Sequence, residues 1–149
     1  MLRKTLLLTA MLLAAAGTVL AQSDPITERK ELMKAQGQQL YAVINGMNRG
    51  RVPFDAAKAN AAMDVLAGTA PKIATLFPDS SKPTKKIGDY NASPKIWENK
   101  ADFEKKAADL VKAIAENRDK AKTADGLKQA YANINGACGA CHDSYAVRN

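Results

Sequence analysis

The pattern of apolar positions along the chain predicts four amphipathic helices. The first extends from Pro25 to about Asn48, where apolar or small residues recur at alternating intervals of four and three, as in a bundle helix. Asp24 is a suitable N-cap, and Pro25 suits the first helical position. The expected inward positions of this helix are Ile26, Lys30, Met33, Gly37, Leu40, Ile44 and Met47.

A second helix is predicted from Asp55, another N-cap, to about Phe77. Pro71 lies inside it and is expected to kink or break it, because proline lacks the N–H that continues a helix. Its apolar face is expected to consist of Ala57, Ala61, Val65, Ile73 and Leu76. Residues 78–94 are rich in proline and polar residues and are predicted to form a loop longer than most connections.

The third helix is expected to start at Ser93-Pro94 and to end near Asn117, and the fourth to begin around Thr123 or Asp125. No segment shows the sustained alternation of a strand. Four helices with mostly short links predict an all-α, antiparallel up-down-up-down four-helix bundle. The expected inward positions of the fourth helix are Leu127, Tyr131, Ile134, Cys138, Cys141 and Tyr145.

Residues 1–21 have the features of a secretory signal peptide. Arg3 and Lys4 precede an apolar run over residues 6–20, and the small residue Ala21 suits a cleavage site. An uncleaved membrane anchor is the alternative, but the run is short for a span and polar sequence starts at Gln22. We therefore expect residues 22–149 to form one soluble domain, exported to a bacterial periplasm and free of the membrane after cleavage.

Composition narrows the possible chemistry. The 149 residues carry a formal charge of +7, with two cysteines and one histidine, too few for a Cys₄ or His₃ metal site. The positive charge does not indicate nucleic-acid binding, because no basic face with interleaved aromatic residues is present. There is no glycine-rich phosphate loop, paired-carboxylate cleft or serine nucleophile motif, so we do not expect an enzyme.

The string Cys138-Gly139-Ala140-Cys141-His142 carries the chemistry. C-x-x-C-H is the attachment signal of c-type haem. On a helix, residues three apart project to one side, so both thiols can form thioethers with one haem c while His142 offers its imidazole to the iron. A thioredoxin-like pair would need a strand-to-helix context, a disulfide would close only a tiny loop, and zinc would need a fourth ligand.

A C-x-x-C-H string near the C-terminus of a helical chain resembles the class II c-type cytochromes, which include cytochrome c′. The resemblance covers essentially the whole of residues 22–149. Further strings make it similar to the low-spin cytochrome c-556 branch: Leu32-Met33-Lys34, Pro53-Phe54-Asp55, Leu76-Phe77-Pro78-Asp79-Ser80 and Ser93-Pro94-Lys95-Ile96-Trp97. One departure is Ala146, which occupies the position where the family usually has a basic residue, four after the histidine.

The resemblance implies a bundle with one covalent haem that transfers electrons, with Met33 as the sixth iron ligand opposite His142. Geometry agrees, because antiparallel first and last helices would place these two residues at one level of the bundle. Met47 lies 14 residues beyond Met33, about 21 Å along a helix. An ordinary core methionine is the alternative for Met33. The alternative function is a five-coordinate cytochrome c′ that binds small gases such as nitric oxide.

Several cations are candidates for secondary roles. Arg29 and Lys30 lie near the expected haem level and are predicted to contact haem propionates, with a solvated helix face as the alternative. Lys82, Lys85 and Lys86 make the long loop basic, which would steer an acidic redox partner, although a solvated loop is the simpler interpretation.

Either a monomer or a homodimer is expected, since relatives form dimers through their first two helices.

Overall fold

The computed structural model describes residues 24–82 and 90–148. The predicted signal peptide and the lysines at positions 85 and 86 lie outside the described residues. Within the described part, no helix is long and apolar enough to cross a membrane.

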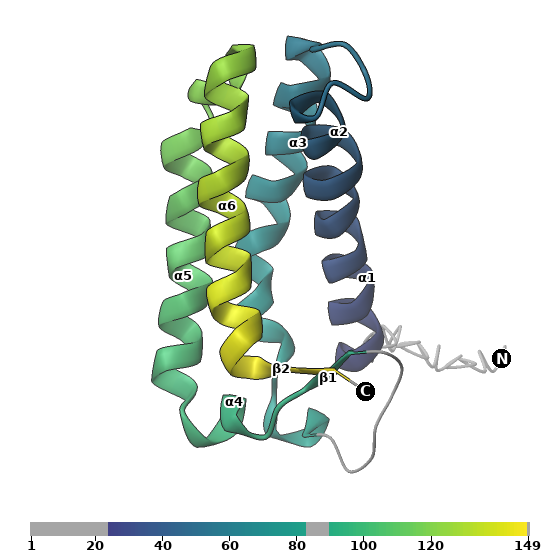
Figure 1. The fold of residues 1–149 in the computed structure, drawn as a ribbon. Helices are drawn as coiled ribbons and strands as arrows, with labels where there is room; N and C mark the ends of the chain where they lie inside the picture. Colours follow the sequence, from purple (N-terminus) through teal and green to yellow (C-terminus); the bar gives the residue numbers. More distant parts are fainter. Residues whose placement is uncertain (1–23, 83–89, 149) are drawn as a thin grey trace, which may run out of the picture.

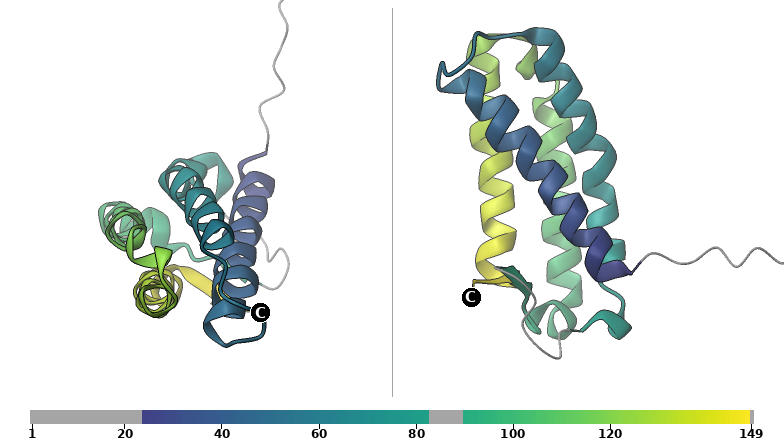
Figure 2. Two further views of the ribbon diagram at one scale, coloured as in Figure 1. Left: turned by 90° about the horizontal axis from the view of Figure 1, so that it is seen from above. Right: turned by 90° about the vertical axis from the view of Figure 1, so that its right-hand side faces the viewer.

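Four long helical segments form an antiparallel bundle that runs up, down, up and down (Figure 1; Figure 2). The first is continuous from Pro25 to Asn48, and its middle forms a π-helix, which the sequence pattern did not reveal. The second changes from an α-helix to a 3₁₀-helix at its C-terminal end. In chain order the segments are α1 (Pro25–Gly37) with η1 (Gln38–Ile44) and α2 (Asn45–Asn48), α3 (Ala56–Thr69) with η2 (Ala70–Leu76), α5 (Lys100–Asn117), and α6 (Ala124–Tyr145).

Side-chain caps define where three of these helices begin, and the caps at Asp24 and Asp55 were predicted from the sequence. The Asp24 carboxylate accepts hydrogen bonds from two backbone N–H groups in the first turn of α1. Asp55 accepts one from the Lys58 N–H at 3.0 Å, and the Thr123 hydroxyl accepts one from the Gly126 N–H at 3.1 Å. Each cap satisfies donors that the helix itself leaves without partners.

Pro71 marks the change from α3 to the 3₁₀ segment η2, so the predicted break is confirmed. The predicted apolar face of this segment is correct only at its C-terminal end, where Ile73 and Leu76 are buried. The expected inward positions at its start were wrong, because Ala57, Ala61 and Val65 are exposed. Alanines lie on every side of α3, so their spacing does not mark a face, and the helix turns its bulky residues inward. Its buried residues are Ala59, Ala62, Met63 and Leu66.

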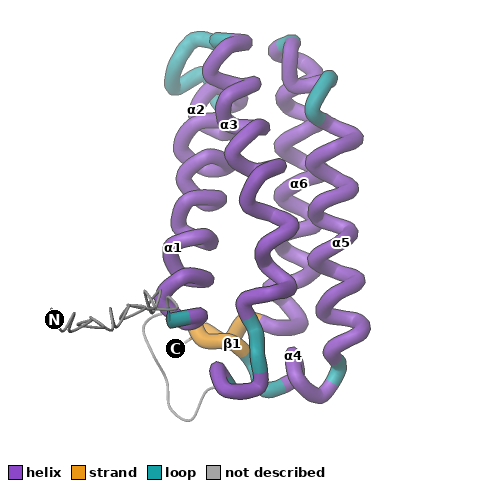
Figure 3. Tube along the Cα trace, turned by 180° about the vertical axis from the view of Figure 1, so that it is seen from behind, coloured by secondary structure: helices purple, strands orange, loops and turns teal. Residues whose placement is uncertain are grey.

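Short elements close the lower end of the bundle (Figure 3). β1 (Tyr90–Ala92) pairs antiparallel with β2 (Ala146–Arg148), and the Ser93 N–H donates to the Tyr145 carbonyl at 2.9 Å. The sequence did not predict this sheet, since three-residue strands are too short to show alternation. η3 (Asp79–Ser81) and α4 (Lys95–Glu98) also lie at this end, whereas η4 (Lys120–Lys122) joins α5 to α6 at the upper end of the bundle (Figure 1).

The packing of the helices differs along the bundle. Near the top, α6 packs against η1 and α2, whereas lower down α1 packs against η2 and α3 and has few contacts with α6. Figure 2 shows α1 leaning across the bundle rather than running beside α6. The two helices that carry the predicted site residues therefore diverge at the level of those residues.

Candidate functional site

A cavity of about 560 Å³ lies where α1 and α6 diverge. α5 also contributes to the wall of the cavity. Residues of η2, β1 and β2 complete this wall. This volume lies within the range of about 300–1,000 Å³ that is usual for cofactor pockets. All six residues predicted from the sequence to form the site line this one cavity: Arg29, Lys30, Met33, Cys138, Cys141 and His142.

Cys138 and Cys141 present their side chains from the same face of α6, because they lie almost one helical turn apart. Both are partly buried free thiols packed against the core. Burial, and secondarily the neighbouring Cys141, raises the pKa of the Cys138 thiol to about 11. Burial likewise raises the pKa of Cys141. Both side chains are therefore neutral thiols at pH 7.

His142 follows directly on α6 and lies at the opening of the cavity. Its side chain remains accessible to solvent, yet desolvation by the surrounding wall lowers the pKa of the imidazole below its usual value. Asp143 opposes this shift without outweighing it. The neutral imidazole that results is the form that can donate a lone pair to a metal.

Met33 is distinguished from the other two methionines in the described residues by its position. It is partly buried and lines the cavity from α1. Met63 is completely buried in the core, and Met47 is buried where its sulfur accepts a hydrogen bond from the Asp55 N–H at 3.4 Å. Neither of these two is part of the cavity wall. A thioether from α1 and an imidazole from α6 therefore share one cavity.

Arg29 is held firmly at the cavity wall. Its guanidinium donates to the Leu76 carbonyl at 3.5 Å and to the Ser81 hydroxyl and carbonyl at 3.3 and 3.4 Å. Its central carbon lies 4.8 Å from the centroid of the Phe77 ring, a cation–π contact. Burial lowers the pKa of Arg29, although an arginine remains charged at any ordinary pH.

Four cations line the cavity, and among the described lining residues there is no aspartate or glutamate. Arg29 and the exposed Lys30 and Lys34 come from α1, whereas Lys106 comes from α5. Such a lining favours a ligand that carries negative charge at its edge.

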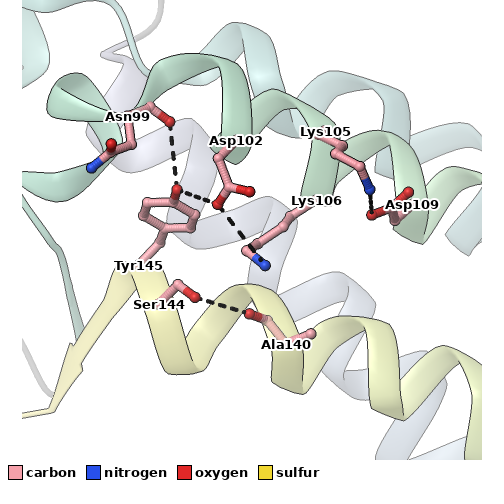
Figure 4. Close-up of polar contacts among 8 residues, drawn as sticks. All are labelled: Asn99, Asp102, Lys105, Lys106, Asp109, Ala140, Ser144 and Tyr145. Carbon is pink, nitrogen blue, oxygen red and sulfur yellow. Dashed lines mark hydrogen bonds and ion pairs between the residues drawn. The ribbon is translucent and has the colours of Figure 1, made fainter.

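Sequence reasoning missed Lys106 and its partners. The Lys106 ammonium lies 3.9 Å from an Asp102 carboxylate oxygen, and this same oxygen accepts a hydrogen bond of 2.6 Å from the Tyr145 hydroxyl (Figure 4). This hydrogen bond, together with burial, raises the pKa of Tyr145 to about 12. The available signal was spacing, since Lys106 lies three residues after the buried Phe103 and four before the buried Leu110.

The structure also shows the position of Ala146, which replaces the basic residue usual in the family. α6 ends at Tyr145, and Ala146 begins β2 at the edge of the cavity. Among the described lining residues, lysine and arginine side chains come from α1 and, as Lys106, from α5, and none comes from the end of α6.

Aromatic rings form one apolar side of the cavity. Phe77 and Phe103 meet edge to face at 4.8 Å between centroids, and Phe103 meets Tyr145 at 5.4 Å. Trp97 packs behind Phe77, with its indole N–H donating to the Pro78 carbonyl at 3.3 Å. Edge-to-face packing of this kind adds stability beyond area burial alone and keeps the wall rigid.

These features together fit a haem. The cavity has the size of a cofactor pocket, one wall is aromatic, and cations are available for propionates. Two thiols suitable for thioethers lie beside an imidazole on one helix. A structural metal site is a poorer fit, since the described residues contain no group of three or more histidine, cysteine or acidic side chains arranged around an ion.

The fold and this cavity define the chain as a four-helix haem protein, and comparison with known proteins agrees. The family model described as Cytochrome C' matches residues 24–146. The chain is 37% identical to cytochrome c-555 of Bradyrhizobium diazoefficiens over 147 residues, which cover 99% of both chains. It is 37% identical to cytochrome c-556 of Rhodopseudomonas palustris over 143 residues, 95% of each chain.

A solved structure shows the same fold. Cytochrome c′ from Rhodopseudomonas palustris superposes with a TM-score of 0.77 at 31% identity, covering 86% of this chain and 99% of the other. The chain belongs to the cytochrome c′ family, whose members are haem proteins without enzymatic activity. The family carries haem c and is typically periplasmic, and the C-x-x-C-H string of this chain has the pattern that covalent haem requires.

Proposed function

We propose that this chain is a periplasmic electron-transfer protein with one low-spin, six-coordinate haem c. The observation that carries the proposal is that Met33 lines the same cavity as Cys138, Cys141 and His142, while Met47 and Met63 are buried elsewhere. The 37% identity to a cytochrome c-556 supports the low-spin branch that the sequence resembles, in which Met33 occupies the position of the sixth ligand.

Each residue has a distinct role in this proposal. Cys138 and Cys141 hold the group covalently through two thioethers, and His142 and Met33 are the axial ligands of its iron. Arg29, oriented by Ser81 and Phe77, contacts a propionate, and Lys30 at the exposed rim contacts the other. When bound, the haem supplies a reversible one-electron change at iron.

The chain's own residues allow this one-electron change with little rearrangement of the site. Met33 and His142 lie on separate rigid helices of one bundle, so they keep their positions in both oxidation states. The apolar wall of Phe77, Phe103 and Leu110 excludes water from the cavity. A methionine ligand favours ferrous iron and raises the potential, as suits an electron carrier.

Export is a second part of the proposal. We propose that residues 1–21 are removed as a signal peptide, and the match to the family model supports this by starting at residue 24. The redox partner is proposed to be an acidic protein, because Lys30 and Lys34 remain exposed at the cavity rim. Either a monomer or a homodimer is compatible with this role.

A five-coordinate protein that binds small gases is the second candidate. The similarity to the cytochrome c′ of Rhodopseudomonas palustris favours it, because the fold is shared with that protein. This candidate requires that Met33 leave the iron open, with its thioether packed as an ordinary apolar side chain.

The visible absorption spectrum of the purified holoprotein separates the two candidates. For the proposed function we expect a weak far-red methionine–iron band in the oxidised form. We also expect sharp low-spin bands on reduction, and no change when carbon monoxide is added to the reduced protein. A high-spin spectrum that shifts readily with carbon monoxide would establish the gas-binding candidate instead.

A further inference from the structure

The cation Lys106 is separated from the other charged residues of the cavity. Arg29, Lys30 and Lys34 all lie on α1, the helix that carries Met33. Lys106 lines the cavity from α5, the helix that packs most extensively against α6, where Cys141 and His142 lie. Its charge therefore acts on the cavity from the α5 side, where it also acts on Cys141.

This lysine is held in place by two neighbours. Its ammonium lies 3.9 Å from Asp102, one turn earlier on α5. The same Asp102 oxygen accepts the Tyr145 hydroxyl at 2.6 Å, and that hydroxyl also lies 3.4 Å from the Asn99 carbonyl. Tyr145 is 94% buried, which fixes Asp102 and with it the direction of the lysine. Figure 4 shows Tyr145 reaching from α6 to this pair on α5.

The next lysine on the helix is a natural comparison. Lys105 pairs with Asp109 at 2.8 Å, also one turn away on α5. Its side chain is 70% exposed and does not line the cavity, whereas the Lys106 side chain is only 26% exposed. Two lysines with the same kind of partner therefore differ chiefly in whether they face the cavity.

We propose that Lys106, held by Asp102 and Tyr145, is a positioning cation that raises the reduction potential of the haem from the α5 side of the cavity. This inference rests on the proposed attachment of haem at Cys138 and Cys141. One-electron reduction removes one positive charge from the cavity, so a fixed cation at its wall favours the reduced form. The Asp102 carboxylate, farther from the cavity and more exposed, opposes it in part.

Midpoint potentials of the holoprotein variants, measured by spectroelectrochemical titration with chemical mediators, test the proposal. We expect Lys106→Gln to lower the potential, Lys106→Arg to restore it, and Asp102→Asn to raise it. The matched control Lys105→Gln should leave the potential close to that of the wild type. Added salt should suppress any residual effect at Lys105 more than the effect at Lys106, because exposed charges are screened more strongly.

Equal potentials for Lys106→Gln and Lys105→Gln would overturn the inference. If Lys106→Gln does not retain its haem, Lys106→Met, which keeps an unbranched side chain without the charge, replaces it: a lowered potential supports the inference and an unchanged one overturns it. Wild-type protein that lacks covalent haem would contradict the proposed function itself. A haem-loaded wild type with no difference between the two lysine variants would contradict only the role of Lys106.

Discussion

Met33 on α1 and His142 on α6 line one cavity from helices that run in opposite directions and diverge at that level. The divergence matters because two closely packed helices would leave no space for a planar group between the two side chains. Higher in the bundle, where α6 packs against η1 and α2, the interior is filled by buried apolar residues such as Ile44 and Leu127. The site is therefore confined to the end of the bundle where the chain also supplies its two cysteines.

Replacing Met33 by alanine should remove the sixth ligand. We expect the far-red band of the oxidised holoprotein to disappear and the reduced protein to bind carbon monoxide, because the open position is then available to an external ligand. Met63→Leu is the matched control, since Met63 is fully buried away from the cavity and a volume-conserving swap costs less than about 1.5 kcal/mol. A far-red band that persists in Met33→Ala would show that another group ligates the iron.

Replacing the cysteines should change how the haem is held. Cys138→Ser and Cys141→Ser should each leave one thioether, and the double variant should leave none. Intact-protein mass spectrometry after extraction with acidified acetone measures this directly. We expect the haem mass to remain on both single variants and to be lost from the double variant. Haem mass retained by the double variant would contradict attachment through these two residues.

Much of this fold follows from sequence, because a bundle helix repeats its apolar positions over several turns. The caps at Asp24 and Asp55 and the break at Pro71 were predicted for local reasons and are confirmed, and the fourth helix begins at Thr123, one of the two expected starts. α3 was misread because its alanines satisfy any helical face. The π-helix η1 was not predicted, because its residues keep an ordinary helical pattern.

The site residues also divide into those that the sequence identified and one that it did not. A contiguous string identified Cys138, Cys141 and His142, and the family resemblance, supported by a level argument, added Met33; the structure brings all four to one cavity. Their roles as haem ligands remain predictions. Lys106 escaped notice because its importance depends on α5 packing beside α6, and lysines are normally solvent-exposed. Within α5, only its spacing of three from Phe103 and four from Leu110 distinguishes it from Lys105.

Arg29 should contribute to stability through the shape of its guanidinium as well as its charge. Arg29→Lys keeps the charge but cannot reproduce the contacts with Leu76, Ser81 and the Phe77 ring. We expect a loss of about 1–2 kcal/mol in the free energy of unfolding, the net worth of one or two hydrogen bonds. Urea denaturation measures it, and Lys72→Gln, at an exposed position away from the cavity, should change stability by less than about 0.5 kcal/mol. Equal effects of the two substitutions would mean that these contacts contribute nothing.

Gly126 in the first turn of α6 should tolerate no side chain. A β-carbon there would lie 1.9 Å from the Lys120 carbonyl oxygen and 2.9 Å from the Thr123 hydroxyl, which caps the helix. The first neighbour is backbone and cannot rotate away, so Gly126→Ala must displace η4 or abandon the cap. We expect a loss of about 1–3 kcal/mol in the free energy of unfolding, the usual cost of overpacking.

Gly136 provides the matched control on the same helix, because a β-carbon there meets no atom within 4 Å. Gly136→Ala should stabilise the protein by up to about 1 kcal/mol, since alanine favours the helix over glycine. Urea denaturation of both variants gives two free energies that should change in opposite directions. If Gly126→Ala were as stable as the wild type, the turn from η4 into α6 would have to be looser than the contacts of Thr123 and Lys120 indicate. The α6 start would then not be fixed from this end, and the placement of Cys138 and His142 would depend on the packing of α6 against α5 alone.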